Sequence, residues 1–184
     1  MKHKVRRAAI LAAAAVSAAT VLMPAAAHAA PAPGVPAGSF YTEVINRDSG
    51  KCMNVRHGNS KMGEAIQEYH CDHTPAAKFL FRAMGSDVSG TEWYQVENQN
   101  SRYCLSPQSW VNPGGDPLIQ FACQNARYEM WKLVPQQFGY YELANRETGR
   151  CVAIPDWNRD DWTQLKELDC AAGRADQEWY LHLG

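Results

Sequence analysis

Residues 44–52 read VINRDSGKC, and close variants of this stretch return as VENQNSRYC at residues 96–104 and as LANRETGRC at residues 143–151. Each copy begins with an aliphatic residue, keeps an asparagine six positions before its cysteine and has a serine or threonine three positions before it. The copies are 52 and then 47 residues apart. Self-similarity with this kind of period predicts a chain built from repeated supersecondary units.

The six cysteines follow the same repeat. A second cysteine stands 19 positions after the first in each copy, which gives the pairs Cys52 and Cys71, Cys104 and Cys123, and Cys151 and Cys170. Six cysteines allow 15 pairings in principle, and the equal spacing favours one disulfide within each repeat. By the chain-entropy estimate, a bridge that closes a loop of roughly 20 residues stabilises a fold by about 3 kcal/mol.

The segments that lead into the repeated asparagines predict β-strands. FYTEVI at 40–45, WYQVE at 93–97 and YYELA at 140–144 are apolar or alternating and end in turn-forming residues. No stretch between turn signals holds a helical period. A single unit of this kind cannot bury its own apolar face. We therefore predict an all-β fold in which three lobes, at about 40–92, 93–139 and 140–184, close around a shared core.

The first 29 residues predict an export signal. Four cationic residues within residues 1–7 precede an uncharged run of apolar and small residues at 8–22, and Ala27-His28-Ala29 has the small-x-small pattern of a cleavage site. The run is shorter than the roughly 20 residues that a membrane span needs. Residues 30–39 contain three prolines and predict a linker before the domain at 40–184. We expect a secreted protein, in a compartment where disulfides persist.

Charge and motifs exclude several classes of function. Without the leader, 14 Lys and Arg stand against 19 Asp and Glu, a net charge of -5. A domain with this net charge lacks the excess of basic residues that nucleic-acid binding requires. The sequence also has no second long apolar run that would predict membrane insertion. The sequence has no nucleophile elbow, phosphate loop or zinc-binding helix motif. We expect a binding protein rather than an enzyme, with no cofactor and no metal.

The repeat resembles that of the ricin B-type β-trefoil lectins. The third repeat closes with Gln177-Glu178-Trp179, which matches the Gln-x-Trp motif of that family. Glu129-Met130-Trp131 and Phe79-Leu80-Phe81 are taken as its counterparts in the second and first repeats. The resemblance covers residues 40–184 and implies a β-trefoil. It also implies a non-catalytic, lectin-like function with extracellular glycans or glycoproteins as partners.

In that family each lobe can hold one sugar, and the resemblance places the best site in lobe one. Asn54 stands where the family has an acid, Gln67 and Tyr69 stand in register, and Lys78 stands at the place of an asparagine. An aromatic ring stacks on the C–H face of a sugar while polar groups bond its hydroxyls. The amide of Asn54 weakens those bonds, because charge-assisted hydrogen bonds are roughly twice as strong.

The other two lobes depart further from the family pattern. Ser106 and Ala153 occupy the acid positions, and only the second lobe keeps an aromatic platform, Phe121. We expect no standard site in either lobe, although Phe121 can still stack on a sugar.

Two tryptophans, Trp157 and Trp162, lie in the acidic loop PDWNRDDW at 155–162. Exposed tryptophans predict a stacking platform or a contact for a protein partner, and the alternative is that they cover the cap of the trefoil. Because all three lobes lack the acid, the alternative is a trefoil that has lost sugar binding. Such a protein would act as an interaction module, for example a toxin delivery subunit or an inhibitor.

Overall fold

The computed structural model describes residues 38–109 and 115–183, so the predicted leader at 1–29 and most of the predicted linker at 30–39 lie outside the described residues. The strands of the described part are β1 (Phe40–Asn46), β2 (Cys52–Val55), β3 (Ile66–Tyr69), β4 (Lys78–Ser86), β5 (Glu92–Asn98), β6 (Cys104–Pro107), β7 (Leu118–Phe121), β8 (Met130–Pro135), β9 (Tyr141–Asn145), β10 (Cys151–Ala153), β11 (Lys166–Leu168) and β12 (Trp179–His182). The short 3-10 turns are η1 (Arg56–Gly58), η2 (Pro75–Ala77), η3 (Arg127–Glu129), η4 (Gln137–Gly139), η5 (Pro155–Trp157) and η6 (Ala175–Gln177). This confirms the all-β prediction.

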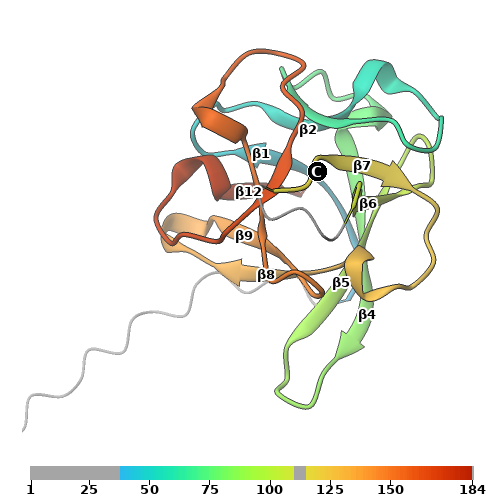
Figure 1. Cartoon of the computed structure of the whole chain (residues 1–184), viewed down its shortest axis with the longest axis vertical. Helices are drawn as coiled ribbons and strands as arrows, with labels where there is room; N and C mark the ends of the chain where they lie inside the picture. Colours follow the sequence, from blue (N-terminus) through green and yellow to red (C-terminus); the bar gives the residue numbers. More distant parts are fainter. Residues whose placement is uncertain (1–37, 110–114, 184) are drawn as a thin grey trace, which may run out of the picture. The chain divides into compact units, whose positions relative to one another are not determined.

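Six strands close a barrel. β1 pairs with β4, β4 with β5, β5 with β8, β8 with β9, β9 with β12, and β12 returns to β1, always antiparallel. Figure 1 shows β4 and β5 as long neighbouring strands at one end of the barrel, with β2, β6 and β7 toward the other. Closure leaves the barrel without an open edge.

Three hairpins complete the trefoil: β2 with β3, β6 with β7, and β10 with β11. They touch one another through isolated bridges between Ala65 and Ile119, Gln67 and Gln164, and Pro117 and Lys166. Lobe one therefore comprises β1–β4, lobe two β5–β8 and lobe three β9–β12. One disulfide lies in each lobe, joining Cys52 to Cys71, Cys104 to Cys123 and Cys151 to Cys170, as predicted.

The core lies inside the barrel, where each lobe contributes equivalent apolar residues. Val44, Val96 and Leu143 are fully buried, as are the closing aromatics Phe79, Trp131 and Trp179. Trp131 and Trp179 donate their indole N–H to the carbonyls of Leu105 and Val152 at 3.1 and 3.0 Å. A buried tryptophan needs such a partner, so each indole also ties the barrel to its own hairpin.

The repeated asparagine explains why the opening stretch determines the fold. The Asn46 side-chain oxygen accepts hydrogen bonds from the backbone N–H groups of Asp48 and Ser49, at 2.8 and 3.2 Å. Its amide donates to the carbonyls of Asp176 and Glu178 in lobe three, which precedes lobe one around the closed barrel. Asn98 and Asn145 make the same turn and bond the preceding lobe in the same way. One side chain thus shapes the turn and joins two lobes, which an aliphatic residue cannot do.

These contacts correct the predicted register of lobe one. The backbone N–H after each repeated asparagine bonds the carbonyl of Lys78, Met130 or Glu178. Lys78 is therefore equivalent to Glu178, and Phe79 rather than Phe81 is equivalent to Trp179. The prediction aligned Phe81 because lobe one has neither the Gln nor the Trp of the motif. The residue that corresponds to the family asparagine is Ala76, two positions before Lys78.

Within the described part of the chain, no helix reaches the length and apolarity that crossing a membrane requires.

Candidate functional site

A cavity of about 380 Å³ opens beside the β2–β3 hairpin of lobe one. Asn54 from β2 and Tyr69 from β3 line it, and Trp162 from lobe three joins them. Strand register places Asn54 opposite Gln67, and Tyr69 lies two residues further along β3. Side chains two apart on a strand share a face, so the hairpin directs Tyr69 and Gln67 to the same side.

The cavity has an aromatic wall built from two lobes. The Trp162 ring centroid lies 4.2 Å from that of Tyr69 and 4.9 Å from that of His57. Trp162 remains 43% exposed, and its backbone has a φ of +73°. A bulky residue rarely adopts this left-handed conformation, and it persists only when surrounding contacts hold it.

Those contacts come from β3 and the turn before β2. The Trp162 N–H donates to the Glu68 carbonyl at 3.0 Å, and the Glu68 N–H donates to the Thr163 carbonyl at 2.9 Å. The Lys51 ammonium lies 2.8 Å from the Asp161 carboxylate and lowers the pKa of that carboxyl through their hydrogen bond. Lobe three therefore places its tryptophan on lobe one through several independent anchors.

Polar groups stand around the aromatic wall. Asn54 is only 3% exposed and contributes a donor and an acceptor at the cavity lining. The exposed Asp72 places a carboxylate at the rim, where one of its oxygens accepts from the Thr74 N–H at 3.1 Å. Asn100, from lobe two, also lines the cavity and donates to the Gly58 carbonyl at 2.8 Å.

Gln67 lies behind this lining rather than in it. Its side chain is fully buried and its oxygen accepts from the Arg56 Nε–H at 3.2 Å. Its amide nitrogen has no hydrogen-bond partner within residues 38–109 and 115–183. A buried amide donor without a partner costs stability, and Gln67 supports the cavity from behind without lining it.

Lys78 does not join this group. It lines a second cavity, on the outer face of the barrel, while Ala76 lines the lobe-one cavity in its place. The register shift described above is the cause, because the side chain that points toward Asn54 and Tyr69 is two residues earlier than predicted. Alanine offers no hydrogen bond, so the polar set of the cavity differs from the family pattern at that position.

The other predicted platforms are separated. Phe121 is partly exposed on β7, and the Ser106 hydroxyl donates to the neighbouring Pro107 carbonyl at 3.1 Å. Trp162 lines the lobe-one cavity, and Trp157 is not among its lining residues. The Arg174 guanidinium lies 5.2 Å from the Trp157 ring centroid.

At the position in lobe three that is equivalent to the lobe-one cavity, an ion pair is found. Arg174 forms a two-pronged ion pair with Asp176, at 3.0 and 2.6 Å. Asp176 is the equivalent of Ala76, and Ala153 and Leu168 are the equivalents of Asn54 and Tyr69. The lobe thus lacks both the polar floor and the aromatic platform.

Several lining residues escaped the sequence prediction, and His57, Asp72 and Asn100 are the ones with polar side chains that reach the cavity from a turn or from another lobe. Asp72 directly follows Cys71 in the sequence. This position next to the disulfide was the one sequence feature that could have placed Asp72 beside the site. Asn100 belongs to the next lobe, and nothing in the sequence of lobe one indicates its approach.

Metal ligands do not gather in the described part of the chain, where no three His, Cys, Asp or Glu side chains are grouped so as to hold an ion.

Solved structures share this fold. A designed 3-fold symmetric protein, ThreeFoil, superposes with a TM-score of 0.69 at 21% identity, covering 77% of this chain and 97% of its own. An exo-beta-1,3-galactanase from Clostridium thermocellum gives 0.70 at 22% identity, covering 79% of this chain but 30% of its own. A ricin B-like lectin of Macrolepiota procera in complex with lactose gives 0.62 at 11% identity, covering 78% and 95%.

No curated protein matches the sequence significantly. The sequence pattern of the ricin-type beta-trefoil lectin domain, in contrast, matches residues 40–179. Repeat, disulfides, closed barrel and family match agree: the chain belongs to the ricin-type β-trefoil lectin family, whose domains are carbohydrate-binding modules.

Proposed function

We propose that this protein is a secreted, non-catalytic lectin that binds extracellular glycans in the lobe-one cavity. The observation that carries the proposal is the aromatic wall of Tyr69 and Trp162 beside the buried Asn54. A sugar ring presents a C–H face to an aromatic and hydroxyls to polar groups, and this cavity offers both. Three disulfides in the domain fit an extracellular protein.

The missing acid is compensated in part from elsewhere in the cavity. The Asn54 amide replaces the family carboxylate, while Asp72 supplies a carboxylate at the rim. Charge-assisted bonds to sugar hydroxyls then come from Asp72 instead of the cavity floor. The relative in complex with lactose shows that this fold holds a neutral sugar in another protein, and we extend that ligand class to this chain.

The test is a glycan array on the protein without residues 1–29, followed by titration of the strongest glycan into variants. Tyr69→Ala and Trp162→Ala each remove one face of the wall and are expected to weaken binding roughly tenfold or more, as loss of a well-packed aromatic anchor does.

Lobe three provides matched controls. Leu168→Ala changes the residue equivalent to Tyr69, and Trp157→Ala removes the tryptophan that stands away from the cavity. Both should bind the glycan as the wild type does. Binding that survives Tyr69→Ala and Trp162→Ala would place the sugar elsewhere. An array without any bound glycan, together with a stoichiometric protein partner on co-purification, would support the interaction-module alternative.

A further inference from the structure

The three junctions between lobes carry equivalent residues with one systematic difference. Each junction has an aromatic residue three positions before the buried aliphatic: Tyr41, Trp93 or Tyr140. Each junction also includes the residue directly after the repeated asparagine. The backbone N–H of that residue donates to the carbonyl of Glu178, Lys78 or Met130 in the adjoining lobe. At two junctions this residue is an arginine, Arg146 or Arg47, and at the third it is Gln99.

The arginines cover their aromatic partners. The Arg146 guanidinium lies 5.1 Å from the Trp93 ring centroid, and that of Arg47 lies 5.4 Å from the Tyr140 ring centroid. Both distances fall within the range of a cation–π contact. Trp93 is accordingly only 8% exposed, although Lys132 also approaches its ring.

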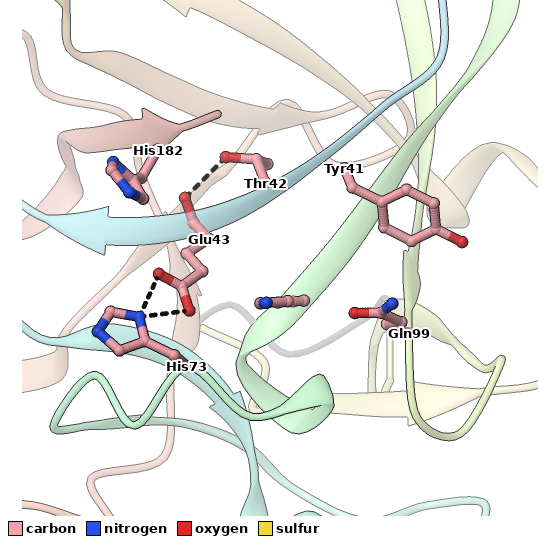
Figure 2. Close-up of a pocket in the computed structure, with 7 residues that line it drawn as sticks. Tyr41, Thr42, Glu43, His73, Gln99 and His182 are labelled. Atoms are coloured by element: carbon pink, nitrogen blue, oxygen red, sulfur yellow. Dashed lines mark hydrogen bonds and ion pairs between the residues drawn. The ribbon is translucent and has the colours of Figure 1, made fainter. Parts of the chain in front are cut away.

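The junction between lobes one and two lacks this cover. Tyr41 is 45% exposed, and within the described residues no cation lies over its ring. A cavity of about 420 Å³ lies beside it, and Gln99 lines the same cavity, close to Tyr41 in Figure 2. The shorter glutamine thus leaves open a space that an arginine closes elsewhere.

A buried carboxylate forms the floor of this cavity. Register places Glu43 of β1 between His182 of β12 and Lys78 of β4. Glu43 is only 4% exposed, and both of its carboxylate oxygens lie 2.9–3.0 Å from Nδ1 of His73 (Figure 2). A carboxylate has about four acceptor positions, so this contact leaves acceptors for a ligand.

Two turn residues at this junction are unusual in the same way. His73 has a φ of +56°, where the equivalent positions are Asn125 and Gly173, and Arg102 has a φ of +66°, where they are Gly50 and Gly149. Glycine and asparagine adopt this conformation readily, whereas other residues pay for it.

The side chains of these two residues both contact residues that line this cavity. His73 contacts the Glu43 carboxylate, and Arg102 donates to the Tyr41 hydroxyl at 3.2 Å. Strained residues cluster where their side chains have a role. These two departures from threefold symmetry therefore lie at the same cavity as the exchange of arginine for Gln99.

From this we propose a second glycan-binding site, formed by Tyr41, Glu43, Lys78 and Gln99 at the junction of lobes one and two, that takes a neutral hexose unit. The Tyr41 ring would stack on the sugar, Glu43 would accept from its hydroxyls, and Lys78 and Gln99 would donate to them. A cationic ligand is opposed by Lys78 and an anion by Glu43, whereas a neutral polyol satisfies both. The ligand class follows the proposed function, but the site is separate from the lobe-one cavity.

Threefold symmetry supplies the test variants. Gln99→Arg introduces the residue that covers the aromatic at the other two junctions, and Glu43→Gln introduces the residue of lobe two, Gln95. Each is the natural residue at an equivalent place, and thermal unfolding checks that both variants fold. Tyr69→Ala disables the lobe-one cavity without touching this one.

The measurement is NMR titration of the isotope-labelled domain with lactose, maltose, cellobiose and chitobiose, each observed at the Tyr41 ring and at the Trp162 indole. At least one sugar is expected to shift Tyr41 in wild type and in Tyr69→Ala. Gln99→Arg should abolish that shift, and Glu43→Gln should weaken the affinity about tenfold, as loss of a charge-assisted hydrogen bond does.

The two proposals fail in different ways. Shifts confined to Trp162 overturn the second site and leave the lobe-one site standing. Shifts at Tyr41 with none at Trp162 in wild type overturn the lobe-one site alone, and no shift with any sugar overturns both. A Tyr41 shift that Gln99→Arg leaves unchanged, or one caused by methylguanidinium and by no sugar, overturns the second glycan site.

Discussion

Glu167 is a fully buried carboxyl group at a position that is repeated in all three lobes. Its counterparts are Glu68 and Gln120, and all three side chains have no exposure to solvent. The Thr148 hydroxyl lies 3.2 Å from both Glu167 oxygens, as the Ser101 hydroxyl lies 2.6 Å from the Gln120 oxygen. Lobe two thus fills the position with a neutral amide, and the other two lobes with an acid.

Burial raises the pKa of Glu167 from 4.5 to about 7, opposed by the Thr148 hydrogen bond. The folded state therefore holds a proton that the unfolded chain releases near pH 4.5, and stability falls as pH rises from about 4.5 through 7. Glu167→Gln removes this effect. We expect it to raise the free energy of unfolding at pH 8 by up to about 3 kcal/mol, measured by denaturant unfolding.

The same variant at pH 4.5 should gain much less, because the carboxyl is already protonated there. A gain of equal size at both pH values would show that packing, and not ionisation, is responsible. Burial also raises the pKa of Glu68, so Glu68→Gln is expected to act in the same direction.

Single residues also show how far the sequence reaches. The family resemblance places Asn54 and Tyr69 by their distance from the cysteines, and both line one cavity because a disulfide and a short hairpin fix their register. Lys78 was misplaced because lobe one lacks the closing Gln and Trp. The spacing of eight residues from Cys71 to Phe79, the same as from Cys123 to Trp131, was the signal for the true register.

At the scale of elements, the loop between β10 and β11 connects lobe three to lobe one. Besides the backbone bonds at Trp162, its Arg159 forms a two-pronged ion pair with Asp48, at 2.8 and 2.5 Å. The sequence shows this loop and its tryptophans but not its path, because the contacts join residues about 110 positions apart. Such a tertiary contact leaves no periodic signal.

Arg159→Ala tests the role of this loop. The substitution removes one anchor while leaving every residue of the cavity wall in place. We expect glycan affinity to fall by less than in Trp162→Ala, and amide exchange in the loop to rise. Unchanged exchange would show that the remaining anchors suffice, and loss of affinity equal to that of Trp162→Ala would show that this ion pair alone holds the tryptophan.

The disulfides act at the same scale. Replacing Cys104 and Cys123 by serine removes a bridge between cysteines 19 positions apart in lobe two, away from Tyr69. We expect the free energy of unfolding to fall by about 3 kcal/mol, measured by denaturant unfolding, with glycan affinity retained. Replacing Cys52 and Cys71 should in addition weaken glycan binding, since Tyr69 lies opposite Cys52 on the hairpin. Equal loss of affinity in both double variants would contradict the placement of the site.

At the scale of the whole molecule, threefold repetition determines the fold, and the proposed binding sites lie at its exceptions. The repeated asparagine, cysteines and aliphatics predict the trefoil because each makes a local turn, bridge or core contact that recurs three times. Two exceptions lie in the proposed binding sites. Gln99 stands where the other lobes have arginine, and Tyr69 stands where lobe three has Leu168. A repeat pattern identifies the residues that the three lobes share and does not reveal the differences between lobes. The fold was therefore predictable from the sequence, and the complete lining of the cavity was not.

The most direct test of the central proposal is the crystal structure of the domain bound to the strongest glycan from the array. We predict electron density for a sugar ring against Tyr69 and Trp162, with a hydroxyl within hydrogen-bond distance of Asn54 or Asp72. Density for the glycan at another surface, with the space between Trp162 and Asn54 filled only by water, would contradict it.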